Sequence, residues 1–154
     1  MYDIKPIGVI KRGDTLRIEI EKEFAPALLA LDHFSHVIVL WWAHGLDTPE
    51  YRGMMQIDPP YAPEHRCGVF ATRAPYRPNP IALTVCPVVS VDVERGELVV
   101  ADIDAVDGTP VLDLKAYFPV CDRVKDAHIP EWLNDWPEWA PENGLSLEIY
   151  GEEE

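Results

Sequence analysis

The chain has 154 residues, of which 47% are hydrophobic and 26% are charged, so it fits one globular domain and is neither disordered nor of low complexity. It carries 13 Lys and Arg residues against 27 Asp and Glu residues, a formal net charge of −14. This charge repels polyanions at long range, so any contact with nucleic acid has to be local, and binding to an anionic membrane surface is not expected.

The sequence contains no predicted membrane span, secretory signal or nucleotide-binding glycine motif. The longest purely apolar run, residues 37–43, is too short to cross a bilayer, and the start MYDIKPIG lacks the basic-then-apolar grading of a signal peptide. No GxG occurs among the nine glycines, which argues against a Rossmann or Walker site. We therefore expect a cytoplasmic protein that lacks both of those nucleotide sites.

The three cysteines are predicted to be reduced core thiols. Cys67, Cys86 and Cys121 have no CxxC spacing and lie in or beside apolar stretches. His33 and His36 form an HxxH without a further ligand nearby, so we expect packing and local hydrogen bonds from them. No metal site is predicted.

Alternation of apolar and polar residues is the commonest pattern, and it predicts strands. In chain order these strands are residues 7–10, 16–20, 36–42, 67–72, 81–93, 97–103, 111–117 and 145–149. Residues 24–31 and 129–136 instead place their apolar side chains on one helical face, each with a proline near the start. The second of these helices is rich in Trp and is predicted to dock on the sheet or on a partner.

Many short strands with few helices between them predict a mainly β fold, namely an antiparallel β-barrel with one or two short helices. We expect a single domain over residues 1–154. Its core covers residues 5–120, and a helix-bearing C-terminal extension covers residues 121–150.

The most unusual stretch is residues 67–86, CGVFATRAPYRPNPIALTVC. Proline restricts its own φ and the preceding residue, so the loop at residues 74–80 presents Tyr76, Arg77 and Asn79 with little freedom to lose. Residues 61–85 carry three Arg against one Glu, a net charge of +2 in an acidic chain. The alternative is a proline-stiffened hairpin loop whose arginines only keep an edge soluble.

A second motif is residues 101–117, ADIDAVDGTPVLDLKAY. Asp107-Gly108 between two strand-like runs is typical of a hairpin turn, which is the plain alternative to a functional role. Beyond it, Asp113, Lys115 and Tyr117 share one strand face that is able to line a site. A third candidate is the end of the buried run HVIVLWWAHG, where His44 and Gly45 reach the surface.

These motifs occur together, with IGVI near the start, then FSHVIVLWWAHG, GVFATRAPYRPNPIALT and DAVDGTPVLDLKAY. In this order the chain resembles the TrmO or TsaA-like family over roughly residues 5–120. Members of that family are S-adenosylmethionine-dependent methyltransferases built on a β-barrel, and they form homodimers in which the barrels pack together. The family reaction methylates the exocyclic amine of a threonylcarbamoyl-adenosine beside the tRNA anticodon.

The resemblance also implies site residues. Those expected around the cofactor S-adenosyl-L-methionine are His44, Gly45, Arg73, Leu83, Asp104, Asp107, Gly108 and Thr109. Those expected to shape or support the substrate pocket are Tyr76, Arg77, Asn79, Asp113, Lys115 and Tyr117. The chemistry is consistent, because carboxylates attract a sulfonium cation and an arginine suits the cofactor's carboxylate. The catalytic base is left open among His44, Tyr117 and a carboxylate.

The sequence departs from the family pattern in several places. Ala82 replaces a usual glycine and Ala116 a usual proline, and the chain is expected to be a short form without the additional C-terminal domain of members that act on tRNA. The predicted function is therefore that of an S-adenosylmethionine-dependent N-methyltransferase. Its methyl acceptor is predicted to be either a tRNA adenosine or a small metabolite. The non-catalytic alternative is an S-adenosylmethionine-binding sensor or adaptor that works through Trp132, Trp136 and Trp139.

Overall fold

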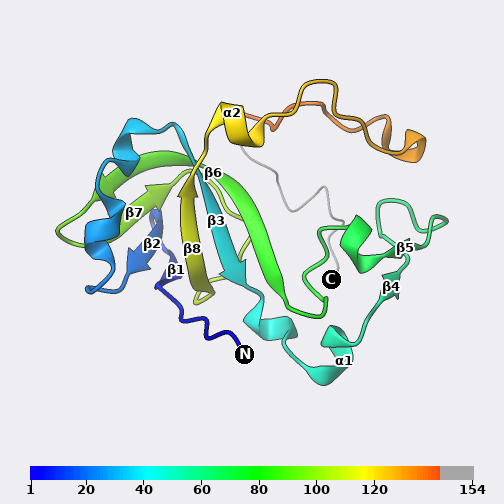
Figure 1. The fold of residues 1–154 in the computed structure, drawn as a ribbon, viewed down its shortest axis with the longest axis horizontal. Coiled ribbons are helices and arrows are strands. Elements are labelled where there is room, and N and C mark those ends of the chain that lie inside the picture. Colours follow the sequence, from blue (N-terminus) through cyan, green and yellow to red (C-terminus); the bar gives the residue numbers. More distant parts are fainter. Residues whose placement is uncertain (143–154) are drawn as a thin grey trace.

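The computed structural model describes residues 1–142 and consists mainly of antiparallel strands (Figure 1). Six strands close into a barrel in the order β1-β2-β7-β6-β3-β8. Their bounds are Gly8–Arg12 for β1, Leu16–Ile20 for β2, His36–Trp42 for β3, Ile81–Asp92 for β6, Glu97–Val100 for β7 and Pro110–Ala116 for β8. The predicted antiparallel β-barrel is confirmed.

The interior of the barrel is filled by the apolar residues that alternate along each strand. In β3, for example, Val37, Val39 and Trp41 are buried while their neighbours face outward. Each fully buried Val, Leu or Ile side chain contributes about 1.5–3 kcal/mol to the free energy of unfolding. Cys86 is also fully buried, and burial, followed by the nearby charges of Asp104 and Asp102, raises the pKa of its thiol to about 12. Cys86 is therefore a protonated core thiol at neutral pH.

Both ends of the barrel are closed by chain segments outside the strands. At one end, the 3₁₀ turns η1 (Ala25–Leu28) and η2 (Leu31–His33) insert the buried Leu28. At the other end, residues 101–109 insert Ile103 and Ala105, each 1% exposed. The Arg12 guanidinium donates to the carbonyl oxygens of both these residues, with a distance of 2.8 Å from Nε to Ala105.

Between β3 and β6 the chain leaves the barrel and forms an arm, residues 44–80, which extends to the right in Figure 1. The arm contains η3 (His44–Leu46), α1 (Pro49–Arg52), β4 (Gln56–Ile57), β5 (Cys67–Gly68) and η4 (Val69–Ala71). β4 and β5 pair as a separate two-stranded sheet. A further segment follows β8 and contains α2 (Pro119–Asp122) and η5 (Glu131–Leu133).

The C-terminal segment contacts the arm. The Trp132 ring stacks on His65 with centroids 4.4 Å apart, and Trp136 packs edge-on against Tyr61 at 5.0 Å. The predicted helix over residues 129–136 is wrong, because only Glu131–Leu133 form a helical turn, and its Trp side chains contact the arm. Pro130 and Pro137 leave room for only one 3₁₀ turn between them. Within residues 1–142, no helix is long and apolar enough to cross a bilayer.

Three other sequence predictions need correction. The predicted strand at residues 67–72 ends after Gly68, because the Thr72 hydroxyl donates to the Val69 carbonyl at 2.8 Å and closes the turn of η4. The predicted helix at residues 24–31 is interrupted at Ala30, whose φ is +72°, although its apolar face does pack on the core. All three cysteines are free, but Cys121 is exposed. The predicted strand at 145–149 lies outside the described residues.

Two glycines with positive φ allow a test of the packing at a barrel turn. A methyl group at Gly96 (φ +66°) would lie 2.8 Å from the Ile20 carbonyl oxygen, whereas one at Gly108 (φ +81°) meets no atom within 4 Å. Both Ala variants pay the conformational penalty of about 1–2 kcal/mol. We expect Gly96→Ala to lower the free energy of unfolding by at least about 1 kcal/mol more than Gly108→Ala in urea titrations. Equal losses would contradict this packing.

Candidate functional site

The acidic loop, residues 101–109, extends the pairing of β1 with β8. The Gly108 N–H donates to the Ile10 carbonyl at 2.8 Å, and the Ile10 N–H donates to the Thr109 carbonyl at 2.9 Å. The Arg12 N–H donates to Asp107 Oδ1, also at 2.8 Å. The Thr109 hydroxyl is buried and donates to Val106, which closes the turn. The loop is therefore held along its length before any ligand binds.

Neither of the two motifs is a simple hairpin. The Asp107-Gly108 turn joins β7 to β8, but β7 pairs with β2 and β6 while β8 pairs with β1 and β3. The proline loop, residues 74–80, is the last part of the arm and leads into β6, while β5, the strand before it, pairs only with β4. Both plain hairpin alternatives are therefore wrong, and each loop crosses between strands that are not neighbours.

Asp104 is anchored on the opposite side of the acidic loop from Asp107. Asp104 Oδ1 accepts a hydrogen bond of 2.5 Å from the Thr84 hydroxyl of β6. The same hydroxyl accepts from Trp41 Nε1 of β3 at 3.0 Å. Asp104 is thus bonded to β6 and is linked to β3 only through Thr84, whereas Asp107 is bonded to β1.

Arg52 fastens the base of the arm to the proline loop. Its guanidinium donates to the Pro78 carbonyl at 2.8 Å, to Asn79 Oδ1 at 3.0 Å and to Asp47 Oδ1 at 3.0 Å. Trp42 Nε1 donates to the other oxygen of Asp47 at 3.0 Å. Because Asp47 follows His44 and Gly45 by only a few residues, this clamp holds that exposed segment beside the proline loop.

Within the arm, the predicted site residues Arg77 and Arg73 differ in their contacts. The Arg77 guanidinium donates to the carbonyls of Thr72, Ala74 and Val69 at 3.1–3.3 Å. Arg73 is exposed and makes no hydrogen bond or ion pair with any described residue. Arg73 therefore presents an unpaired guanidinium next to a turn that Arg77 makes rigid.

The aromatic residue of the proline loop also packs within the arm. The Tyr76 ring stacks against Tyr51 with centroids 6.2 Å apart and an interplanar angle of 28°. Tyr51 belongs to α1, the same short helix that carries Arg52. Tyr76 and Asn79 therefore both contact α1, one through its ring and the other through its side-chain amide.

The remaining predicted residues lie on the outer face of the barrel. Leu83 pairs with Leu40 of β3, which in turn pairs with Asp113 of β8, and the next row is Val85, Ile38 and Lys115. Directly paired residues of antiparallel strands point to the same face. Lys115 Nζ lies 2.9 Å from Asp113 Oδ2, and this hydrogen bond and charge raise the pKa of Lys115. Tyr117 lies near the ring of His36, with centroids 6.2 Å apart.

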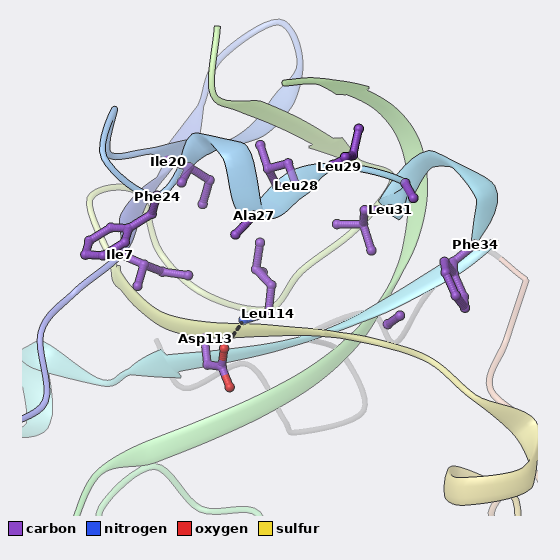
Figure 2. A pocket seen from close by; sticks show the side chains of 12 residues that line it. Ile7, Ile20, Phe24, Ala27, Leu28, Leu29, Leu31, Phe34, Asp113 and Leu114 are labelled. Atoms are coloured by element: carbon purple, nitrogen blue, oxygen red, sulfur yellow. Dashed lines mark hydrogen bonds between the residues drawn. The ribbon is translucent and has the colours of Figure 1, made fainter. Parts of the chain in front are cut away.

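The contacts of the predicted cofactor residues within one chain divide them into three groups. These groups lie at the acidic loop, at the arm and on the outer face, and no hydrogen bond or ion pair among the described residues joins Arg73 to Asp104 or Asp107. A pocket of about 300 Å³ lies instead at the end of the barrel closed by η1 and η2, lined mainly by apolar residues. None of the eight predicted cofactor residues lines it. Asp113, a residue predicted for the substrate pocket, is one of its lining residues, although its side chain lies on the other side of the β8 ribbon from Leu114 in Figure 2.

Sequence reasoning missed the residues that hold these loops in place. Arg12, Arg52 and Asp47 carry no recognisable motif, because their partners lie far along the chain or in irregular backbone. Thr84 does have a local signal, since it is a hydroxyl residue at an inward position of an apolar strand. Such a group needs a hydrogen-bond partner when it is buried.

We expect Arg52→Lys to loosen the base of the arm, since a lysine ammonium cannot reproduce the planar fork that reaches three acceptors. Amide hydrogen exchange at residues 44–53 and 72–80 rises about tenfold, while exchange in the barrel strands is unchanged. Arg66→Lys is the matched control, because Arg66 pairs only with Asp58 within the arm. Equal exchange at residues 72–80 in the two variants would count against the clamp.

Comparison with known proteins identifies relatives of the chain. An S-adenosyl-L-methionine-binding protein of Archaeoglobus fulgidus is 40% identical over 136 residues, which cover 79% of this chain and 93% of that protein. A tRNA (adenine(37)-N6)-methyltransferase of Mus musculus is 41% identical over 91 residues, 59% of this chain and 20% of the mouse protein.

Solved structures agree with these sequence relatives. A crystal structure of TrmO matches with a TM-score of 0.66 and 31% identity, over 84% of this chain and 63% of that one. TrmO from Pseudomonas aeruginosa matches with a TM-score of 0.63 and 30% identity, over 83% and 61%. This chain thus spans less than two thirds of the crystallised proteins. The family model described as the tRNA-methyltransferase O N-terminal domain matches residues 2–123, and the chain belongs to this family.

Proposed function

We propose that this protein binds S-adenosylmethionine and transfers its methyl group to the exocyclic amine of a threonylcarbamoyl-adenosine beside the tRNA anticodon. Membership of the tRNA-methyltransferase O family and the names of the relatives support the reaction class. The observation that carries the proposal is that Arg73, unlike three other arginines, has no partner among the described residues. Arg12, Arg52 and Arg77 hold loops in place, whereas Arg73 is rigidly presented and unpaired.

The residues present fit the chemistry of this cofactor. An unpaired guanidinium suits the carboxylate of the methionine moiety. Asp104 and Asp107 each have one oxygen that bonds to no described residue, and such oxygens suit a sulfonium cation or ribose hydroxyls. Leu83, 42% exposed, offers an apolar contact, and a methyl group at Gly45 or Gly108 meets no atom within 4 Å, so a ligand can approach the backbone there.

When bound, S-adenosylmethionine supplies the reactive methyl group, and the contribution of the chain is to position the acceptor against it. His44 is exposed at the point where the buried strand β3 joins the arm, and its segment is held there by the Arg52 clamp. His44 is therefore better placed than Tyr117 to take the proton that the methylated amine releases. Tyr117 lies toward the other end of β3, next to His36.

The same geometry weakens the adaptor alternative. Such a protein needs its Trp side chains free for a partner. Here Trp132 stacks on His65, Trp136 contacts Tyr61, and Trp139 receives the Arg123 guanidinium 4.5 Å from its ring centroid. Each of these Trp residues remains 37–60% exposed, so these contacts cover part of the surface that an adaptor would offer to a partner.

We further propose that the active form is a homodimer that pairs the outer faces of β3, β6 and β8. Ile81, Leu83 and Val85 alternate along β6, and each is 38–42% exposed. A row of exposed apolar residues on one sheet face is typical of a protein interface. Within one copy, Leu83 lies on the outer face of the barrel, whereas Thr84 and its partner Asp104 do not. A second copy offers a way to complete the site with residues of the outer face. A two-fold contact brings the outer face of each copy against the other.

Turnover tests the proposed reaction. Incubation of the protein and S-adenosylmethionine with tRNA that carries threonylcarbamoyl-adenosine is expected to yield the methylated nucleoside in mass-spectrometric digests. Arg73→Ala should lower kcat/KM by about tenfold to a hundredfold through loss of a charge-assisted hydrogen bond, with Arg73→Lys intermediate. Methylation of a small metabolite in an extract, with none of the tRNA, would instead support the alternative acceptor. Saturable binding without transfer to anything would support the sensor.

Self-association tests the dimer. Val85→Asp places a charge in the middle of the apolar row and is expected to shift the protein from dimer to monomer in sedimentation velocity at micromolar concentration. Val89→Asp is the matched control, because Val89 lies on the same strand and is 61% exposed but is beyond the part of β6 that pairs with β3. A monomeric wild-type protein would refute the proposed dimer.

A further inference from the structure

A chain of three hydrogen-bonded side chains runs from the core of the barrel to the acidic loop. Trp41 belongs to β3 and is buried in the core cluster, with 9% of its surface exposed. Its Nε1 donates to Thr84 Oγ1 at 3.0 Å. Thr84 Oγ1 donates to Asp104 Oδ1 at 2.5 Å. The three residues come from β3, β6 and the acidic loop, so no local sequence pattern unites them.

The direction of both hydrogen bonds follows from the chemistry of the three groups. An indole N–H can only donate, so Thr84 Oγ1 must be the acceptor of the bond from Trp41. The single hydroxyl proton of Thr84 is then left for Asp104. A separation of 2.5 Å is typical of a hydroxyl that donates to an ionised carboxylate. The chain of bonds therefore makes Asp104 Oδ1 the acceptor of the Thr84 hydroxyl.

The surroundings make this arrangement rigid. Thr84 is β-branched and lies in a strand opposite Val39, which is fully buried. Trp41 is fixed in the core cluster. The negative charge of Asp104 also reaches the interior, because it is the second contribution, after burial, to the raised pKa of Cys86. Asp104 Oδ2 bonds to no described residue and is left available for a ligand.

We propose that Thr84 is a positioning residue that, oriented by Trp41, fixes the Asp104 carboxylate so that the site prefers the cationic methyl donor to the neutral thioether product. This inference rests on the proposed binding of S-adenosylmethionine. After the methyl group leaves, the sulfur of S-adenosylhomocysteine carries no charge, and a fixed carboxylate attracts it far less than the sulfonium. Loss of the Thr84 hydroxyl frees the carboxylate to rotate and to be solvated, which reduces the preference.

The experiment compares two ligands by isothermal titration on the full chain. The wild-type protein is expected to bind S-adenosylmethionine more tightly than S-adenosylhomocysteine. Thr84→Val keeps the shape of the side chain but removes the hydroxyl, and should weaken binding of the donor about tenfold and of the product less than about twofold. Thr84→Ser, which keeps the hydroxyl, should restore most of the ratio. Asp104→Asn should lose it as Thr84→Val does, and it remains informative if Thr84→Val fails to fold.

Thr72→Val is the matched control, because this buried hydroxyl donates to the Val69 backbone carbonyl and lies beside Arg73, whose expected partner is the carboxylate that both ligands carry. It should change both affinities by the same factor. If Thr84→Val and Asp104→Asn also weaken both ligands equally, or weaken neither, Thr84 is only structural and the inference is overturned. If the wild-type protein binds neither ligand, the proposed function fails as well, so the two failures are distinguishable.

Discussion

The site depends on the way in which one long strand serves two neighbours. β6 pairs with β3 over Ile81 to Pro87 and with β7 from Val88 onward. The first half of β6 therefore has one edge that β7 does not pair with. The acidic loop runs past that edge, with the Ala101 N–H bonded to the Pro87 carbonyl and Asp104 bonded to Thr84. Closure of the barrel thus places irregular backbone and the Asp104 carboxylate where regular pairing stops.

Arginine is the main means by which this acidic protein holds irregular backbone. Arg12 binds carbonyls of the acidic loop, Arg77 binds carbonyls of the turn at residues 69–74, and Arg52 joins α1 to the proline loop. A guanidinium suits this role because its donors point in several fixed directions. The local positive charge seen in the sequence is therefore largely used within the arm, and Arg73 is what remains for a ligand.

The sequence predicted the barrel because alternation is a local property of each strand. Residues 16–20 and 36–42 were located to the residue; the first run lies between Thr15 and Glu21, and the second begins after Ser35. Short apolar runs rich in Gly, Thr or Pro were misassigned, because their hydrophobicity does not distinguish a strand from a 3₁₀ turn. Alternation within one motif placed Asp113 and Lys115 on the same face, as the structure has them, but the motifs did not show which residues of different strands share a face. That depends on register, including the β-bulge between Leu40 and Trp41.

The distribution of candidate residues over one subunit bears directly on how the site works. Leu83 and Asp113 belong to the outer face, Asp104 is tied to the inward side of β6, and Arg73 lies on the arm. Side chains on opposite faces of one sheet cannot both contact a small ligand through that sheet. For these candidate residues to share one ligand, that ligand has to lie at the edge where the sheet ends or between two copies, and the proposed dimer provides the second arrangement. In either case the orientation of Asp104 is set by the barrel itself, through Trp41 and Thr84, before the ligand arrives.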